Sequence, residues 1–300
     1  MQYKRPKKPI SGVLLLDKPI GFSSNQALQK AKWLLQAAKA GHTGTLDPLA
    51  TGLLPLCFGE ATKFAHYLTD ADKTYEACIK LGVTTKTGDA EGEVLSTQSV
   101  NVSEAQFKQV CEKFTGEITQ VPPMYSALKH EGKALYEYAR AGIEIERKAR
   151  TVYIREIQFN TFDKDIAEIT VTCSKGTYIR TLAEEIGKQL GCGAHLIGLR
   201  RTATANYLIA QAITLEQFEV MSTEARSAAL LPADTAVMHL PALTFDADST
   251  HYLQQGQSVW KSGVVVSGML RLYTDDQVFL GLGELQPDGK VGPKRLIVVT

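Results

Sequence analysis

The sequence predicts an α/β (α+β) protein in which a large domain of helices and strands precedes a small all-β domain. The chain has 300 residues, more than a single average domain needs. Up to about residue 242, segments with helical spacing of apolar residues are interspersed with segments of strand period. From residue 243 onward only short strand-like segments with Gly- and Asp-containing turns remain. The predicted domains are therefore 1–242 and 243–300.

The chain begins with a predicted strand, a turn and a helix. Residues 10–16 are largely apolar and lead into the turn sequence DKPIG at 17–21, which is typical of a buried strand. Ser23 or Ser24 can then cap a helix. The apolar residues that follow at helical spacing are Leu28, Ala31, Leu34, Leu35 and Ala38.

Later segments alternate between the two periods. The predicted strands are 74–81, 152–159, 166–173, 267–273, 278–285 and 296–299. The predicted helices are 60–68, a segment capped by Ser103, and 177–190 with Gly191 as its stop. Residues 82–101 are rich in Thr, Gly, Asp and Ser and predict a loop, and 232–241 predicts a link.

The glycine-rich segment 41–52 (GHTGTLDPLATG) predicts a site. Its three glycines and one proline indicate unusual backbone conformations or close approaches. Pro48 disfavours a helical conformation for Asp47. The neighbouring leucines, Leu46 and Leu49, indicate that the segment is held against a core. A loop held in this way and carrying a carboxylate and an imidazole is typical of a functional site.

Composition excludes several classes of protein. The hydrophobic fraction is 44% and the charged fraction 22%, as in ordinary globular proteins. No apolar run is long enough to cross a bilayer, and the N-terminus lacks the pattern of a secretory signal. The five cysteines are scattered singly, which favours reduced thiols over a disulfide framework or zinc cluster. We therefore expect a cytoplasmic protein with neither a membrane nor a metal as partner.

Basic residues cluster in two places although the formal net charge is only +1. The first cluster comprises Lys4, Arg5, Lys7 and Lys8. The second lies within 125–155 and overlaps 121–142, where Met and Tyr side chains are mixed with Lys and Arg. Aromatic and basic residues mixed in this way suit a surface that binds RNA. A solvated charged face with an aromatic helix packed on the core is the alternative.

Asp47 has several interpretations. An acid in such a loop can cap a helix or close an Asx turn, and these structural roles are the commoner ones. A metal site lacks nearby partners. A hydrolytic pair of carboxylates is not visible locally either, since the next acid is Glu60 within a predicted helix. If Asp47 is catalytic, it acts alone as a nucleophile or base.

An ionised Asp47 in a buried loop requires a nearby cation, because burial alone raises the pKa of a carboxyl group. The segment 173–185 offers Lys175 and Arg180 as candidates. Arg180 also has Glu184 one helical turn later, so a purely structural ion pair is the alternative.

Several segments resemble motifs of the TruB family of pseudouridine synthases. Segment 41–55 (GHTGTLDPLATGLLP) resembles the catalytic motif of the family. Segment 122–140 resembles an insertion often called the thumb, and 253–257 with the C-terminal strands resembles a PUA-like RNA-binding domain. The segments that resemble the remaining motifs are 12–24, 73–75, 176–180 and 194–202.

The resemblance implies both a fold and a reaction. Residues 1–242 would form a pseudouridine synthase catalytic domain, with a mixed, largely antiparallel sheet flanked by helices and a thumb at about 122–150. Residues 243–300 would form the PUA-like domain. The implied reaction is isomerisation of uridine 55 in the T arm (T loop) of tRNA to pseudouridine, without a cofactor or metal, after the base is flipped out.

The resemblance also implies three catalytic residues: Asp47, Tyr75 and Arg180. Asp47 would be the essential carboxylate, acting either as a nucleophile on the sugar or by promoting a glycal intermediate. Arg180 would pair with Asp47 and keep it ionised. Tyr75 would stack on the flipped uracil and take a proton from C5.

The implied substrate-binding residues are Tyr75 and four others. His42 would support the loop from which the base has left. Tyr178 and Leu199 would line the pocket. Lys18 would contact tRNA or order the loop near Asp47.

The implied partner is tRNA, through its T-arm stem-loop, and the protein would be a monomer. An RNA chaperone that remodels tRNA during binding is a second hypothesis, compatible with catalysis in one chain. A uridine isomerase for another RNA and a metal-dependent hydrolase are further alternatives, the latter predicting inhibition by chelators.

Overall fold

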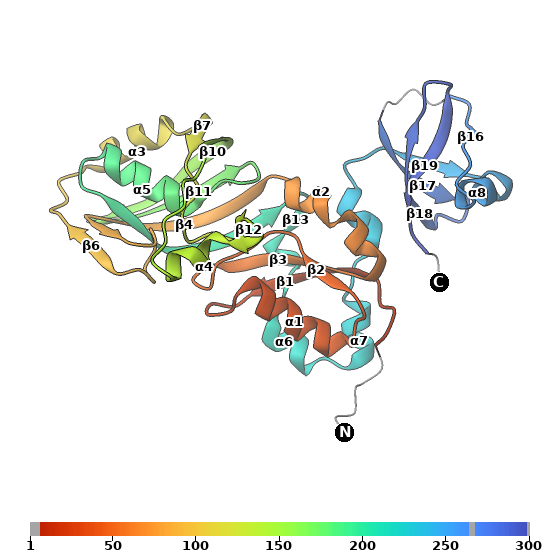
Figure 1. Ribbon diagram of the computed structural model, residues 1–300, viewed down its shortest axis with the longest axis horizontal. Coiled ribbons are helices and arrows are strands. Elements are labelled where there is room, and N and C mark those ends of the chain that lie inside the picture. The colour runs from red at the N-terminus through yellow and green to blue at the C-terminus, as the bar shows by residue number, and fades with distance from the viewer. Residues whose placement is uncertain (1–6, 264–267, 299–300) are drawn as a thin grey trace.

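The computed structural model describes residues 7–263 and 268–298, which form a long, mixed sheet, a smaller second sheet and two short hairpins (Figure 1). The large sheet has ten strands: β14 (Ile213–Thr214), β1 (Gly12–Lys18), β3 (Thr51–Phe58), β12 (Ala194–Thr204), β4 (Lys73–Leu81), β11 (Ile166–Cys173), β10 (Arg150–Asp163) and β7 (Gly116–Gln120) in spatial order, with β2 (Ala40–His42) beside β3 and β13 (Tyr207–Leu208) beside β12. Within this sheet, the parallel pairs among the described residues are β1–β14 and β3–β12. The predicted mixed, largely antiparallel sheet is confirmed.

Along the central strands of this sheet, alternate side chains are apolar and point to one buried face. On β4, Tyr75, Ala77 and Ile79 are buried, and β11 places Ile169 opposite Ala77 and Val171 opposite Tyr75. The helices that cover this face are α1 (Ser24–Leu35), α3 (Glu104–Glu112), α5 (Ile179–Gln189) and α6 (Leu215–Val220). None of the helices in the described residues has both the length and the apolar character needed to cross a membrane.

Serine caps begin two of these helices, as predicted. Ser23 accepts a hydrogen bond from the backbone of Gln26, and Ser103 accepts one from Gln106, so that each forms a capping box. Helix α1 ends at Leu35, since Gln36 adopts a left-handed conformation with φ of 56°. Ala38 therefore lies beyond the helix that its spacing predicted. Another short helix, α7 (Thr223–Ala228), follows α6.

At the β1–β3 end, the opposite face of the sheet is covered by a layer of short helices that also contacts the C-terminal module. Val13, Leu15 and Leu53 share one hydrophobic cluster with Tyr273 and Phe279. The connecting segments in this layer are two 3-10 helices, η1 (Gly59–Phe64) and η3 (Ala233–Val237), and α2 (Ala65–Asp70). A third 3-10 helix, η2 (Ile209–Gln211), follows β13. Burial on this face therefore joins the second sheet to the first.

The C-terminal module is a five-stranded sheet: β15 (Ala242–Phe245), β17 (Met269–Thr274), β18 (Phe279–Leu285), β19 (Lys290–Leu296) and β16 (Val259–Trp260) in spatial order. It also contains α8 (Ala247–Gln254), a helix that the sequence did not predict, capped by Asp246. Strand β15 begins one residue before the predicted boundary at 242/243, and the division into two domains stays a prediction.

Three local predictions are corrected by the structure. The predicted loop 82–101 contains a hairpin of β5 (Val83–Thr85) and β6 (Val94–Thr97), because two short polar strands carry little periodicity. The predicted helix 60–68 is divided between η1 and α2. The predicted strand 296–299 lies earlier, as β19. Lys4, Arg5, Ser267 and Val299 lie outside the described residues.

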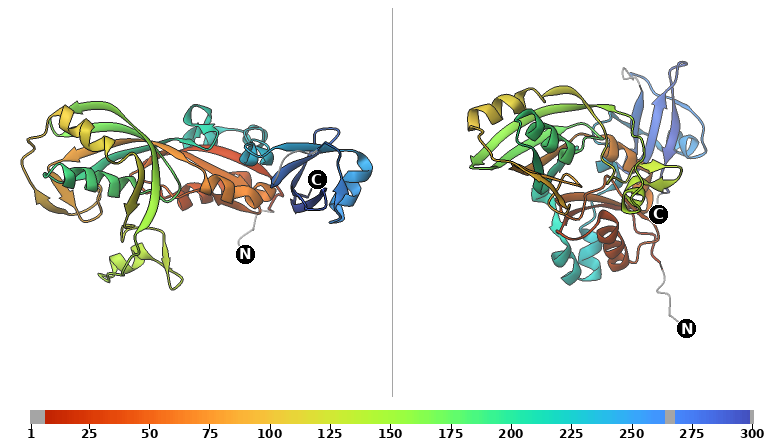
Figure 2. Two further views of the ribbon diagram at one scale, coloured as in Figure 1. Left: turned by 90° about the horizontal axis from the view of Figure 1, so that it is seen from above. Right: turned by 60° about the vertical axis from the view of Figure 1, so that its left-hand side comes forward.

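The thumb projects from the body of the molecule. It contains a hairpin of β8 (Lys129–His130) and β9 (Lys133–Ala134) and the helix α4 (Leu135–Arg140). Figure 2 shows it extending away from the sheet, with the C-terminal module at the far end of the molecule. The thumb leaves the sheet from β7 and returns to it through β10, so its two ends are neighbouring strands.

Gly52 shows how closely the site loop approaches the sheet. Its φ is +102°, and a Cβ at this position would overlap the backbone carbonyl of Arg201. Gly21 also has a positive φ, +81°, but has no neighbour within 4 Å of an added Cβ. We expect Gly52→Ala to lower the free energy of unfolding by about 1–3 kcal/mol more than Gly21→Ala, since only the former overpacks. Urea unfolding of both variants measures the difference, and equal losses would contradict the close approach.

Candidate active site

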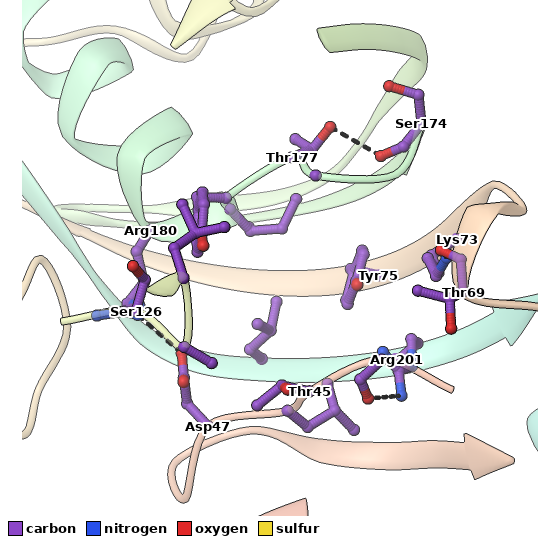
Figure 3. A pocket seen from close by; sticks show the side chains of 18 of the residues that line it. Thr45, Asp47, Thr69, Lys73, Tyr75, Ser126, Ser174, Thr177, Arg180 and Arg201 are labelled. Carbon is purple, nitrogen blue, oxygen red and sulfur yellow. Dashed lines mark hydrogen bonds and ion pairs between the residues drawn. The ribbon is translucent and has the colours of Figure 1, made fainter. Parts of the chain in front are cut away.

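A cavity of about 440 Å³ lies where the loop after β2, the strands β4 and β12, the start of α5 and the base of the thumb meet (Figure 3). Its lining includes six of the seven predicted site residues: His42, Asp47, Tyr75, Tyr178, Arg180 and Leu199. Residues from five separate segments thus converge on one hollow.

The loop that carries Asp47 is fixed from two sides. The backbone N–H of Leu46 donates to the hydroxyl of Ser24 at 2.7 Å, and that hydroxyl lies 3.0 Å from the Leu46 carbonyl oxygen. From the other side, Arg201 donates to the carbonyl oxygens of Leu53 at 2.7 Å and Gly44 at 3.3 Å. The carboxylate of Asp47 therefore stands on a rigid segment, as a catalytic group requires.

Arg180 lies next to Asp47 at one end of the cavity and binds its carboxylate (Figure 3). Its Nη2 lies 3.0 Å from Asp47 Oδ2, and its Nη1 lies 3.4 Å from Asp89 Oδ2. Among the ion pairs of the described residues, Arg180 has none with Glu184, so the structural alternative for Arg180 is not formed. Arg180 is buried, whereas 40% of the Asp47 side chain is exposed. The carboxylate is thus open to a bound molecule while its partner is enclosed.

Asp89 is a member of this site that sequence reasoning missed. It is buried, accepts the backbone N–H of Glu91 at 3.1 Å, and also accepts the hydroxyl of Thr87. It lies between β5 and β6, within the segment predicted as a loop. Nothing in a stretch rich in turn residues distinguishes a buried acid from a solvated one, so only the tertiary contact with Arg180 identifies it.

Opposing effects set the pKa of Asp47. Burial is the largest effect and raises the pKa of the carboxyl group, and the negative charge of Asp89 raises it further. The charges of Arg180 and Lys18 lower it. The net direction is upward, so Arg180 offsets only part of the effect of burial. The fraction of Asp47 that is ionised consequently depends on its cationic neighbours.

Tyr75 and Arg201 are direct cross-strand partners on β4 and β12, and Leu199 lies opposite Ala77 in the same register. The side chains of Tyr75 and Arg201 are buried and line the cavity. Burial raises the pKa of the Tyr75 hydroxyl, and the charge of Arg201 opposes that rise. No carboxylate forms an ion pair with Arg201 within the described chain, so this side of the cavity carries a positive charge without a paired acid.

Two further lining residues were not predicted. Lys73 is buried and donates to the carbonyl oxygens of Thr69 and Ala71, both at 2.6 Å, at the end of α2. Burial lowers its pKa to about 8. Arg150, at the start of β10, reaches the cavity from the base of the thumb. Arg150 belongs to the basic cluster within 125–155, which predicted only a surface, and Lys73 stands in the motif-like segment 73–75, where only Tyr75 received a role.

Lys18 lies outside the cavity lining, contrary to its prediction as a substrate-binding residue. Its side chain is completely buried, and its ammonium donates to the carbonyl oxygens of Pro19 at 2.9 Å and Phe22 at 2.5 Å. Burial lowers its pKa to about 8. This placement favours the other alternative, in which Lys18 orders the loop near Asp47, because a fully enclosed ammonium cannot meet tRNA.

His42 lines the cavity on the side of Arg201. Its Nδ1 is buried and has no hydrogen-bond partner among the described residues. Burial and the charge of Arg201 both lower the pKa of the imidazole. The ring is therefore neutral at pH 7 and available for packing or a hydrogen bond rather than for charge.

Within the described residues, no group of three or more His, Cys, Asp or Glu side chains is arranged so that it could hold a metal ion. Asp47 and Asp89 share the guanidinium of Arg180 instead. Metal-free chemistry stays a prediction.

Solved structures share this architecture. A chain in the crystal structure of a Cbf5-Nop10-Gar1 complex is 27% identical, with a TM-score of 0.71 over 96% of this chain and 84% of that one. A chain in a structure of an H/ACA RNP bound to a substrate RNA containing 2'-deoxyuridine is 24% identical, with a TM-score of 0.72 over 96% and 85% of the two chains. The overall architecture of the chain is thus that of a known fold.

Family models identify the chain more closely. Residues 32–179 match the TruB family pseudouridylate synthase (N terminal domain), 180–238 the tRNA pseudouridylate synthase B C-terminal domain, and 241–297 the C-terminal model of pseudouridine synthase II TruB. The tRNA pseudouridine synthase B of Methylobacillus flagellatus is 59% identical over 99% of this chain and 98% of its own, and that of Thiobacillus denitrificans is 54% identical over 98% of both chains. The chain belongs to the TruB family of pseudouridylate synthases, and is an isomerase.

The charges around Asp47 predict opposite shifts in the pH dependence of pseudouridine formation. The rate should fall as the pH drops through the pKa of Asp47. Arg180→Met removes the largest charge that opposes burial, so we expect the acid limb of kcat/KM to move upward by about 1–3 pH units. Asp89→Asn removes a negative charge and should move the same limb downward. Arg200→Met, which breaks the ion pair with Asp17 at 2.6 Å, serves as a control. If the acid limb of kcat/KM stays in place in both Arg180→Met and Asp89→Asn, this account is contradicted.

Proposed function

We propose that the protein converts uridine 55 in the T arm of tRNA to pseudouridine. The proposal rests on one observation above all: a partly exposed carboxylate, Asp47, is paired with a buried arginine in a cavity at the base of a basic thumb. The relatives named tRNA pseudouridine synthase B, which match along nearly the whole chain, support tRNA as the substrate.

The reaction is an internal rearrangement and needs no second substrate. The bond between N1 and C1′ breaks, the uracil turns, and a bond between C5 and C1′ forms. The proton on C5 is lost and N1 gains one, so atoms balance. Asp47 acts as a carboxylate, either on C1′ as a nucleophile or on the sugar as the base that leads to a glycal. Arg180 stabilises that charge.

A base stacked in a folded T loop cannot reach a cavity of this kind, so it must be flipped out at a cost of a few kcal/mol. In our proposal, Tyr75 stacks on the flipped uracil and takes the proton from C5. Tyr178 and Leu199 form the remaining walls. His42, neutral and with a free Nδ1, packs beside the space that the base has left.

The thumb carries two cation–aromatic pairs that suit the backbone and bases of RNA. Lys133 lies 4.9 Å from the ring centroid of Tyr138, and Arg140 lies 5.4 Å from that of Tyr136. These pairs are absent from the residues that line the cavity. The separation of these pairs from the cavity supports a second activity, tRNA folding, alongside catalysis. We also propose that the protein acts as a monomer in the cytoplasm.

Replacing the carboxylate separates these two activities. We expect Asp47→Asn to form pseudouridine at less than about one thousandth of the wild-type rate, because the amide cannot act as a nucleophile or base. Its affinity for tRNA should stay largely intact, measured by filter binding. Asp70→Asn, which alters an exposed pair with Lys175 at 3.1 Å, is the matched control. Product formation by Asp47→Asn at the wild-type rate would remove Asp47 from the mechanism.

The substrate can be tested in cells. Pseudouridine mapped across total RNA, with and without this protein, should differ at position 55 of tRNA. Loss at a different RNA instead would refute the substrate assignment and favour the alternative of an isomerase for another RNA.

A further inference from the structure

Both ends of the thumb converge on one short segment beside the cavity. Gln120, the last residue of β7, and Arg150, the first residue of β10, are paired directly across the two strands. Between them the chain leaves the sheet and forms the thumb. Each of the two side chains contacts residues 176–178, which lead into α5 and towards Arg180.

Gln120 binds the main chain of Tyr178 through both ends of its amide. Its Nε2 donates to the Tyr178 carbonyl oxygen at 3.3 Å, and its Oε1 accepts the Tyr178 N–H at 3.1 Å. Gln120 is completely buried. Tyr178 occupies the N-cap position of α5, which has no side-chain cap. A residue of the thumb base thus supplies the contacts that hold this turn.

Arg150 holds the same segment through the side chain of Tyr178. Its guanidinium lies 4.8 Å from the centroid of the Tyr178 ring, and its Nη2 donates to the carbonyl oxygen of Gly176. The absence of a side chain at Gly176 permits this approach, since a Cβ there would lie 3.3 Å from Arg150 Cζ. No carboxylate forms an ion pair with Arg150 within the described residues, and Arg150 lines the cavity.

We propose that Arg150 and Gln120 are positioning residues for the isomerisation. They hold Tyr178 in the orientation in which it forms a wall for the flipped uracil. Arg150 acts on the ring by stacking, and Gln120 acts on the backbone. This assignment rests on the proposed function, because it requires a flipped base in the cavity.

A third contact extends this connection to the catalytic pair. Arg180 Nη2, the atom that binds Asp47, also donates to the carbonyl oxygen of Tyr125 in the thumb at 2.7 Å. The thumb and its base therefore contact both Tyr178 and Arg180 directly. The base of the thumb links the grip on RNA to the geometry of the cavity.

The test compares two substitutions of Arg150 in the full-length protein. Arg150→Met removes charge and planarity, while Arg150→Lys keeps the charge but loses the stacking plane. We expect both variants to lower the single-turnover rate on a T-arm stem-loop by about 10- to 100-fold, as for a misplaced substrate wall. The dissociation constant for tRNA should stay near the wild-type value.

Arg155→Met is the matched control. Arg155 lies on the same strand, 4.5 Å from the ring centroid of Tyr153, but outside the cavity lining. It should leave the single-turnover rate unchanged. A second measurement combines Arg150→Met with Tyr178→Ala, where we expect no loss beyond that of Tyr178→Ala alone, since Arg150 acts through that ring. Gln120→Met, with a melting curve to establish folding, should likewise lower the rate without weakening binding.

Other outcomes overturn the assignment. If Arg150→Lys behaves as the wild type while Arg150→Met binds tRNA more weakly and with a smaller salt dependence, Arg150 is a phosphate ligand instead. Additive losses in the double variant would also refute a role through Tyr178. Failure of the proposed function is distinguishable, because the wild-type protein itself would then form no pseudouridine in the T arm.

Discussion

The guanidinium of Arg180 is the interaction on which the arrangement of the site depends. It binds the carboxylates of Asp47 and Asp89 and the carbonyl oxygens of Thr87 and Tyr125. These groups come from the site loop, the β5–β6 hairpin and the thumb. A buried cation that loses a partner typically costs about 3–5 kcal/mol, so the chain must hold these segments together to keep Arg180 satisfied. The catalytic geometry follows from that constraint.

The electrostatics of the cavity are a balance between burial and charge. Burial raises the pKa of Asp47 and lowers those of His42 and Lys18. The charges of Arg180 and Lys18 oppose the rise in the pKa of Asp47. The charge of Arg201 lowers the pKa values of His42 and Lys18 further. A neutral imidazole and a carboxylate whose charge depends on arginine line the same cavity, which suits a reaction in which one acid acts alone.

Much of the scaffold could be predicted because its signals are local. Strict alternation identified β4 and β11, and candidate serine caps identified the starts of α1 and α3. The β5–β6 hairpin and α8 escaped prediction, since short elements carry too little periodicity to exceed the signal of their turn residues. Their stability comes from contacts that the sequence does not display, such as the pairing of Asp89 with Arg180.

By itself, the sequence determined the site loop, the mixture of helices and strands, and, through its motifs, the resemblance that named Asp47 and Tyr75. These depend on residue type and spacing over a few positions. Only the tertiary structure decided that Lys18 is enclosed and that Asp89, Arg150 and Arg201 belong to the site. Whether a charged side chain faces solvent, a carboxylate or a ring depends on which distant strands become neighbours, and that is settled by the packing of the whole sheet.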